Sequence, residues 1–254
     1  MAILLIDAGN TRIKWARCVG GRLGRSQAAA HGSWAARDFA RRLFGVRAPE
    51  RVLVASVAGA RVRAALTQAA HHAGVPIEFL RVPKRGGGVT VGYLEPWRLG
   101  VDRFAALVGA HELFAGVPLL VTGIGTALTL DLLSGAGRHF GGAIIPSPAL
   151  MLETLLARTQ GIRRRAQGGA RRALGPFGRS TRAAITEGAR YAAAAAIDRA
   201  VGEGTVHAGR RPLVVLTGGG AADVRPLLAS ACVTVPDLVL LGLAALATRR
   251  AKRP

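Results

Sequence analysis

The chain has 254 residues, half of them hydrophobic, which is enough to bury a core and excludes an intrinsically disordered protein. Its formal net charge of +21 comes from 35 basic and 14 acidic residues. Such a charge attracts anionic substrates or nucleic acid, but aromatic residues make up only 5% of the chain and offer bases little to stack on. We therefore expect no nucleic-acid partner, and we attribute the charge mainly to a genome that favours arginine and alanine.

The sequence shows no membrane or export signal. The apolar opening run is broken by Asp7, and the apolar run at residues 238–247 is shorter than the ~20 residues that a spanning helix needs. The two cysteines, Cys18 and Cys232, lie far apart and form no metal-binding pattern, which is typical of a reduced, cytoplasmic protein. The six histidines show no metal-ligand spacing, and we expect them at the surface.

Apolar runs and helical periodicity alternate along the chain, which predicts an α/β fold. In the first half, strands are predicted at residues 2–6, 13–18, 51–57 and 77–82. Helices are predicted there at residues 34–44, 60–73 and 98–114, with a glycine-rich loop at 85–88. In the second half, strands are predicted at 118–122, 127–133 and 213–216, and helices at 146–157, 180–201, 222–229 and 237–248.

The two halves look like imperfect copies of each other. Residues 7–11 (DAGNT) correspond to residues 123–127 (GIGTA), because each segment follows one apolar strand and precedes another. Residues 56–66 (SVAGARVRAAL) resemble residues 217–228 (TGGGAADVRPLL) with one residue inserted. We therefore predict two duplicated lobes, residues 1–116 and 117–254, with a helical insertion near 135–205 in the second. Facing glycine turns would leave a cleft between the lobes, which is a favoured place for a ligand.

The turn after the first strand has the chemistry of a phosphate site. Gly9 lets the backbone approach a phosphate, and Asn10 and Thr11 offer short polar donors. Lys14 adds a positive charge, and Asp7 can hold Mg²⁺ directly or through water, because hard cations take oxygen ligands. A hairpin turn capped by Asp and Asn explains the same residues, so this pattern alone leaves both interpretations open.

The corresponding turn of the second half offers backbone N–H groups and the Thr126 hydroxyl to the β- and γ-phosphates of a nucleotide. A hairpin with a bulge is the alternative, but two such turns in corresponding places favour phosphate binding. Further along, Gly218 and Gly219 would let an adenine ring lie against the backbone, or would simply begin a helix. The spacings of a Walker A loop and of a dinucleotide fingerprint are absent.

The segment Gly100-Val101-Asp102-Arg103 lies near the start of a predicted helix. Asp102 and Arg103 would suit a base beside an anion clamp, because the arginine fork binds a carboxylate through two hydrogen bonds. By spacing alone, however, such a pair is more typical of a helix start with both charges on its solvated face.

Taken together, these segments resemble the type III pantothenate kinase family, in order, from residue 3 to about residue 247. The segments that carry the resemblance are residues 7–15 (DAGNTRIKW), 93–96 (YLEP), 99–103 (LGVDR), 125–131 (GTALTLD), 141–146 (GGAIIP), 180–181 with 184–185, and 217–220 (TGGG). The resemblance implies the acetate and sugar kinase/Hsp70/actin fold, with two ribonuclease H-like lobes and a nucleotide cleft between them. It also implies that ATP phosphorylates the primary hydroxyl of pantothenate to give 4'-phosphopantothenate, the first step toward coenzyme A.

The resemblance further implies a role for each matching residue. Asp102 would be the base that accepts the hydroxyl proton. The residues implied to hold pantothenate are Tyr93, Gly100, Val101, Asp102, Arg103 and Thr181. The residues implied to hold ATP are Asp7, Ala8, Gly9, Asn10, Thr11, Arg12, Ile13, Lys14, Thr126, Gly218 and Gly219, with Mg²⁺ at Asp7. A homodimer, with the pantothenate pocket close to the dimer interface, is also implied.

The chain departs from the family pattern at two positions. Gly123 stands where members often carry an aspartate that helps to bind a monovalent cation (K⁺ or NH₄⁺), and Ser147 stands where glycine is usual. Two other functions stay open. One is a catalytically weak ATP-binding protein that acts as a regulatory or nucleic-acid-associated factor, and the other is a kinase of the same fold that acts on a different small hydroxylated acid. The +21 charge favours the former, whereas a base at Asp102 argues against it, because a binding scaffold needs no base.

Overall fold

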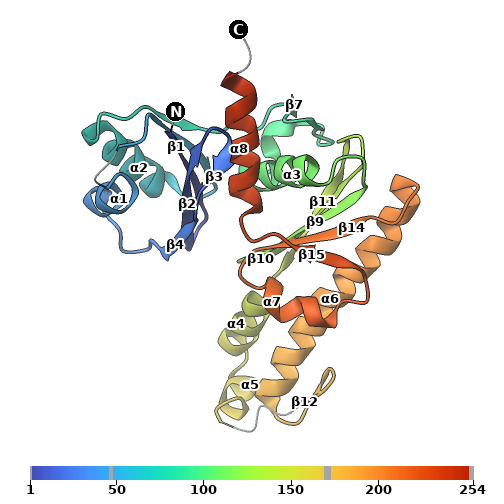
Figure 1. Cartoon of the computed structure of the whole chain (residues 1–254). Coiled ribbons are helices and arrows are strands. Elements are labelled where there is room, and N and C mark those ends of the chain that lie inside the picture. Colours follow the sequence, from blue (N-terminus) through green and yellow to red (C-terminus); the bar gives the residue numbers. More distant parts are fainter. Residues whose placement is uncertain (1, 46–47, 169–172, 252–254) are drawn as a thin grey trace. The chain divides into compact units, whose positions relative to one another are not determined.

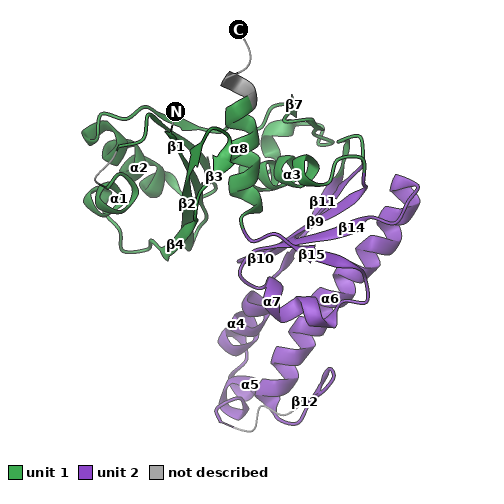
Figure 2. Cartoon of the chain, in the orientation of Figure 1, with its two compact units in different colours: residues 1–116, 135–140, 237–254 green, residues 117–134, 141–236 purple. Residues whose placement is uncertain are grey.

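The computed structural model describes residues 2–45, 48–168 and 173–251 (Figure 1). The sequence has basic clusters at residues 163–172 and 248–254, and parts of them, residues 169–172 and 252–254, lie outside the described range. Internal contacts divide the chain into two compact units (Figure 2). The first unit comprises Met1–Gly116, Gly135–Phe140 and Asp237–Pro254, and the second comprises Val117–Ser134 and Gly141–Pro236.

The first unit is built on a mixed sheet with the strand order β3-β2-β1-β5-β6, in which β4 also pairs with β2. β1 is antiparallel to β2 and parallel to β5, and β6 extends the parallel part. The strands are β1 (Ala2–Ala8), β2 (Arg12–Val19), β3 (Arg22–Leu23), β4 (Gln27–Ala30), β5 (Arg51–Ser56) and β6 (Ile77–Phe79). A separate hairpin, β7 (Arg85–Gly86) with β8 (Val89–Thr90), and the 3₁₀ helix η1 (Pro96–Arg98) also belong to this unit.

Both faces of this sheet are covered, which explains why the middle of β1 and the middle of β5 are continuous apolar runs. Alternate residues such as Leu4 and Ile6 share one core cluster with Phe39 of α1 (Ala36–Leu43) and Leu66 of α2 (Ala60–His72). The residue between them, Leu5, has no exposed surface. On a strand it points to the opposite face, and α8 (Leu238–Ala251) contacts β1 while α3 (Val101–Leu113) contacts β5.

Two glycines let α3 and α8 approach each other closely. A Cβ atom at Gly109 of α3 would collide with the carbonyl oxygen of Leu238, and one at Gly242 of α8 would collide with that of Ala105. Only glycine leaves room for backbone against backbone at these positions. The helix α8 is therefore fixed to a helix of the first unit.

The second unit repeats the strand pattern of the first, in the order β11-β10-β9-β14-β15. β9 is antiparallel to β10 and parallel to β14, which in turn is parallel to β15. The strands are β9 (Leu119–Ile124), β10 (Ala127–Leu133), β11 (His139–Pro146), β14 (Leu213–Thr217) and β15 (Cys232–Thr234). The remaining elements are α4 (Pro148–Arg158), α5 (Gln160–Arg165), β12 (Ala173–Leu174), β13 (Phe177–Gly178), α6 (Thr181–Ala208), α7 (Ala221–Val224) and the 3₁₀ helix η2 (Arg225–Leu227).

The duplicated α/β architecture predicted from the sequence is confirmed. In each unit an antiparallel hairpin (β1–β2 or β9–β10) is followed by a parallel strand that leads into a helix (β5 into α2, or β14 into α7). The units differ from the expected lobes in one respect, since residues 135–140 and 237–254 belong with the first unit. The close contact between α3 and α8 accounts for the second of these segments. None of the helices within the described residues is both long and apolar enough to cross a membrane.

Candidate active site

The turn between β1 and β2 presents the residues of the first predicted phosphate motif. Asp7 is the second-last residue of β1 and lies directly opposite Lys14 of β2 in the antiparallel register, so their side chains share one face of the sheet. The Gly9 amide donates to the Arg12 carbonyl at 3.0 Å and closes the turn. Asn10, Thr11 and Arg12 are exposed, whereas Ala8 and Ile13, on either side of the turn, are fully buried and anchor it in the core.

Asp7 occupies an unfavourable place for a negative charge. Burial, and secondly the charge of Asp102, raise the pKa of Asp7 from 3.8 to about 7, against the lowering effect of Lys14. Asp102 follows Asp7 by 95 positions in the sequence, yet the fold brings their charges close enough to interact. A divalent cation bound here would relieve both causes of the shift.

Lys14 is oriented by an acidic residue that lies outside all the predicted motifs. Its Nζ atom lies 3.1 Å from Oδ1 of Asp237, the residue immediately before α8. The other oxygen of this carboxylate, Oδ2, accepts a hydrogen bond from the Ser26 hydroxyl at 2.9 Å. Because both Asp237 oxygens are engaged, the lysine is held by a carboxylate that is itself fixed.

The first turn of α3 carries Asp102 and Arg103. Gly100 caps the helix, and a Cβ atom there would lie 2.6 Å from Oδ1 of Asp102, so glycine leaves room for the carboxylate. The same Oδ1 atom accepts a hydrogen bond from the Arg103 amide at 2.8 Å. Val101, the first residue of the helix, is partly buried.

Arg103 is buried beside Tyr93, not solvated. Its side chain is 7% exposed, and Nη1 donates to the Tyr93 hydroxyl at 3.2 Å. The Tyr93 ring stacks on His139 with centroids 5.8 Å apart, and its carbonyl accepts from Nζ of Lys84 at 3.2 Å. The interpretation of residues 102–103 as a solvated charge pair is therefore wrong for Arg103. A buried guanidinium requires polar partners, and the hydroxyl of Tyr93 is one of them.

The second unit gathers the remaining predicted nucleotide residues. Thr126 is exposed in the turn between β9 and β10, where the Gly125 amide donates to the Ala127 carbonyl at 2.9 Å. The glycine segment 218–220 lies against the end of β9, because the Gly220 amide donates to the Ile124 carbonyl at 3.0 Å. Gly218 has a φ of 93°, in the region that favours glycine, and Gly219 is exposed.

Gly123 takes the place in β9 that Asp7 takes in β1, one residue before the end of the strand. Only the first unit therefore offers a carboxylate at this position. A Cβ atom on Gly123 would lie 2.8 Å from Oγ1 of Thr129, so a larger residue would require that side chain to move.

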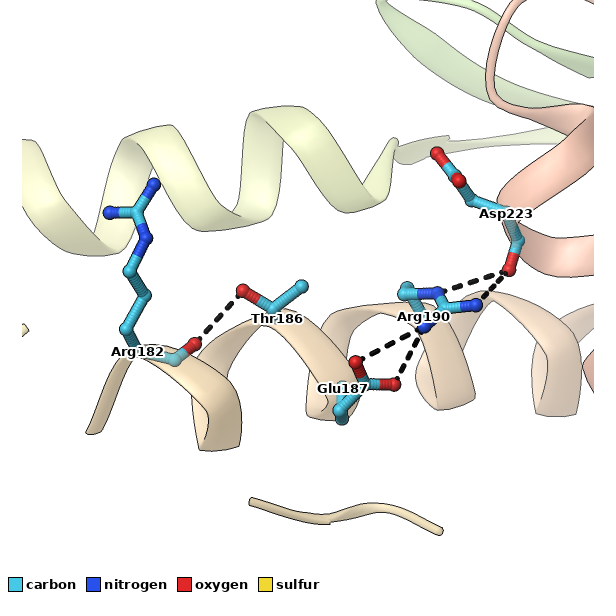
Figure 3. Close-up of polar contacts among 5 residues, drawn as sticks. All are labelled: Arg182, Thr186, Glu187, Arg190 and Asp223. Carbon is cyan, nitrogen blue, oxygen red and sulfur yellow. Dashed lines mark hydrogen bonds and ion pairs between the residues drawn. The ribbon is translucent and has the colours of Figure 1, made fainter. Parts of the chain in front are cut away.

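Arg190 connects α6 to the helix that follows the glycine segment (Figure 3). Its Nε and Nη2 atoms donate to the Asp223 carbonyl of α7 at 3.0 and 2.7 Å. Its Nη1 atom contacts both carboxylate oxygens of Glu187 at 3.1 and 2.9 Å. At the start of the same long helix, Thr181 follows the capping residue Ser180, whose hydroxyl accepts from the Ala183 amide at 3.1 Å.

The structure thus brings the predicted site residues together in two groups. The first unit holds the residues of the β1–β2 turn, with Asp7 close to the start of α3. The second unit holds Thr126, Gly218, Gly219 and Thr181. The participation of both groups in one site stays a prediction.

The donor chemistry of the first group fits a magnesium ion. No group of three or more His, Cys, Asp or Glu residues in the described part of the chain is arranged to hold a metal. Mg²⁺ suits this setting, because it commonly binds through one or two carboxylates plus phosphate and water oxygens. Asp7, whose ionisation is disfavoured in the absence of a cation, is the residue of this group that would hold it.

Two buried histidines correct the expectation that all histidines lie at the surface. His31 is 1% exposed and His139 is fully buried. Nδ1 of His139 is 3.4 Å from the Gly92 amide, and Nε2 of His31 is 2.7 Å from the Gly9 carbonyl. No motif in the sequence next to either histidine indicates that its side chain is buried. The short strand Gln27–Ala30 before His31 and the glycine-containing strand at His139 were not predicted, so both residues lacked a structural context.

Comparison with known proteins assigns these residues to a family. A family model described as type III pantothenate kinase matches residues 3–203. The type III pantothenate kinase of Herminiimonas arsenicoxydans is 39% identical over 251 residues, covering 95% of each chain. That of Xanthomonas campestris pv. campestris is 38% identical and covers 99% of each chain.

Solved structures show the fold. A structure described as a conserved putative Baf family transcriptional activator from Campylobacter jejuni has a TM-score of 0.60 at 17% identity, and the match covers 98% of this chain and 100% of that one. The activator of the 2-hydroxyisocaproyl-CoA dehydratase from Clostridium difficile has a TM-score of 0.57 at 12% identity, and the match covers 99% and 96%. Such neighbours indicate the actin-like ATPase fold. Since the sequence matches extend over nearly the whole chain, the protein belongs to the type III pantothenate kinase family.

Proposed function

We propose that this protein transfers the γ-phosphoryl group of ATP to the primary hydroxyl of pantothenate, giving 4'-phosphopantothenate and ADP, the first step of coenzyme A biosynthesis. The observation that carries the proposal is the arrangement at the start of α3. There, the Asp102 carboxylate accepts from the Arg103 amide and the buried Arg103 guanidinium contacts the Tyr93 hydroxyl. The chain that carries this arrangement matches a type III pantothenate kinase over 95% of its length.

Asp102 and Arg103 of α3 have different roles toward pantothenate. Asp102 accepts the proton of the attacking hydroxyl, and a carboxylate needs to do so only late in a loose phosphoryl-transfer transition state. Arg103 binds the pantothenate carboxylate, because a guanidinium fork matches a carboxylate with two parallel hydrogen bonds. Tyr93 supports the arginine through its hydroxyl, and Gly100 and Val101 shape the helix start. Thr181 is a further residue that we propose to contact pantothenate.

The nucleotide is held by the two glycine turns. The first turn, from Asp7 to Lys14, binds the phosphates with its amides and with Lys14, which Asp237 orients. Thr126 adds a hydroxyl to the phosphates, and Gly218 with Gly219 leaves room for the adenosine. Mg²⁺ at Asp7 would neutralise phosphate charge during the transfer. We further propose that the protein works as a cytoplasmic homodimer.

The test is an ADP-release assay on the purified full chain with Mg²⁺-ATP, in the presence and absence of pantothenate. We expect ADP release that depends on pantothenate, with 4'-phosphopantothenate detected by mass spectrometry. If another hydroxylated acid stimulates ADP release more strongly than pantothenate does, that acid is the substrate. ATP binding without turnover on any acid would favour the regulatory alternative and would refute the proposed activity.

A further inference from the structure

His31 holds the first phosphate turn from both of its sides. It follows β4 directly, and its ring Nε2 lies 2.7 Å from the carbonyl oxygen of Gly9. Its backbone amide donates to the carbonyl of Thr11 at 3.4 Å. Because a carbonyl oxygen only accepts hydrogen bonds, Nε2 must carry the hydrogen and act as the donor. One residue therefore binds the peptides at the start and at the end of the turn.

The remainder of the ring lies in apolar surroundings. His31 is 1% exposed, its ring centroid is 6.4 Å from that of Phe39, and Phe39 in turn packs edge-on against Trp34. Among the described residues, Nδ1 has no hydrogen-bond partner. A buried polar atom without a partner costs free energy. An apolar residue would suit the core better, so packing alone does not account for a histidine at this position.

The hydrogen bond to Gly9 fixes a peptide plane that a phosphate can use. In a trans peptide the C=O of Gly9 and the N–H of Asn10 lie in one plane and point in opposite directions. With the carbonyl turned toward the buried ring, the Asn10 N–H points away from the core, and Asn10 is exposed. Gly9 itself imposes little restraint on this plane, because glycine rotates more freely than any other residue.

We propose that His31 is a positioning residue for ATP binding, which keeps the Gly9–Asn10 peptide oriented so that its N–H donates to a phosphate oxygen. This role rests on the proposed function of the β1–β2 turn. Without the ring donor, the peptide rotates among several orientations, and the N–H meets the phosphate only in a fraction of molecules. ATP binding weakens as a result, while pantothenate binding at the start of α3 stays the same.

Two amide variants of His31 distinguish the effect of losing the hydrogen-bond donor from the effect of altered packing. In His31→Gln the side-chain amide reaches as far as Nε2 does and can still donate to Gly9, whereas in His31→Asn it is one methylene too short. We expect the Asn variant to bind ATP about tenfold or more weakly, the scale of one lost hydrogen bond to a charged group, and the Gln variant to stay within about threefold of the wild type. ATP binding is measured by isothermal titration calorimetry on the full chain, together with KM for ATP and for pantothenate.

Phe39→Leu is the matched control, because it disturbs the same buried cluster without touching the turn. It should lower the melting temperature and leave ATP binding unchanged. If the Asn variant does not fold, His31→Leu, which has no donor, replaces it in the comparison. Three results would overturn the proposal: unchanged ATP binding in a folded variant without the donor, equal weakening in Gln and Asn, or equal weakening in Phe39→Leu. Wild-type protein that binds ATP but leaves pantothenate unchanged would refute the proposed function only, and the comparison of ATP binding would still decide the role of His31.

Discussion

Replacing Asp7 with asparagine should stabilise the ligand-free protein at neutral and alkaline pH. Burial and the charge of Asp102 raise the pKa of Asp7 to about 7, well above its ordinary value of 3.8. The folded protein therefore holds this proton more tightly than the unfolded chain, and stability decreases as the pH rises from 3.8 toward 7. An asparagine side chain at this position would carry no charge at any pH, so the variant would not show this decrease.

The expected change in the free energy of unfolding follows from the part of the Asp7 pKa shift that lies within an accessible pH range. Between pH 5 and about pH 7, Asp7 keeps its proton in the folded protein while the unfolded chain has already lost it, so the free energy of unfolding falls by about 1.4 kcal/mol for each of these roughly two pH units. The free energy of unfolding of the wild type should therefore fall by up to about 3 kcal/mol relative to Asp7→Asn over this range. The variant should also lose turnover, because its amide is a poorer magnesium ligand than a carboxylate.

Urea unfolding followed by tryptophan fluorescence measures this difference in the relevant unit. All three tryptophans, Trp15, Trp34 and Trp97, lie within Met1–Gly116. The measurement is made without ATP or Mg²⁺ at pH 5, 6, 7 and 8, and Glu203→Gln serves as the control for loss of an exposed carboxylate, which paired with Arg199 contributes little. A stability difference between wild type and Asp7→Asn that stays constant from pH 5 to 8 would refute the assignment of a costly buried charge to Asp7.

The other predictions concern turnover. Asp102→Asn should lower kcat by about a hundredfold or more, the usual scale for a general base, while ATP still binds; near-normal turnover would remove Asp102 from its role. Arg103→Lys should raise KM for pantothenate with little change for ATP, because lysine lacks the planar fork, and equal binding of pantothenol by the wild type would contradict a carboxylate clamp. Asp237→Asn should raise KM for ATP by up to about fivefold, since it removes the charge that orients Lys14, and an unchanged KM would show that Lys14 needs no such support. Initial rates should depend weakly or not at all on K⁺ at constant ionic strength, because Gly123 offers no carboxylate; a rise of about tenfold, or roughly 1.4 kcal/mol, would show that a cation site exists without it.

The sequence predicted the elements whose patterns are continuous and missed those that depend on neighbours. β1 and β9 were predicted because each is an apolar run that ends near a glycine turn, and β2 and β10 because each is a strand-like segment that follows such a turn. β11 was missed, because its glycines and exposed residues weaken any alternation. The predicted helix at 222–229 ends at Val224 in the structure, and a 3₁₀ turn containing Pro226 follows, since proline and the residue before it disfavour an α-helix.

Helix α6 shows the opposite error, because it continues beyond the predicted end at residue 201. Glycine has a low helix propensity, yet α6 continues through Gly202 and Gly204 to Ala208. Gly204 is buried, and a Cβ atom there would lie 3.0 Å from the Leu132 side chain and 3.2 Å from that of Pro212. Tight packing against neighbouring elements thus overrides the low helix propensity of glycine.

Site residues that belong to a sequence motif were predicted. Site residues whose role depends on a contact with a distant segment of the chain were missed. The resemblance named Asp7, Asp102 and Arg103, which the structure places in one unit, and the structure adds that Arg103 is buried. His31 directly follows β4, and Asp237 directly precedes α8. Their contacts with the β1–β2 hairpin therefore depend on how segments that are distant in the sequence pack together. No local pattern contains that information.

The position of α8 has a consequence for the order in which the chain folds during synthesis. The first unit needs segments that are far apart in the sequence, because Gly242 of α8 fits against Ala105 and Gly109 of α3, and Asp237 binds Lys14. A nascent chain that has completed the second unit still lacks this helix, so the part of the sheet face at β1 that α8 contacts stays uncovered until α8 leaves the ribosome. Contacts of such long sequence separation form late and slowly. A truncation that reaches into α8 therefore removes part of the core of the unit that is synthesised first.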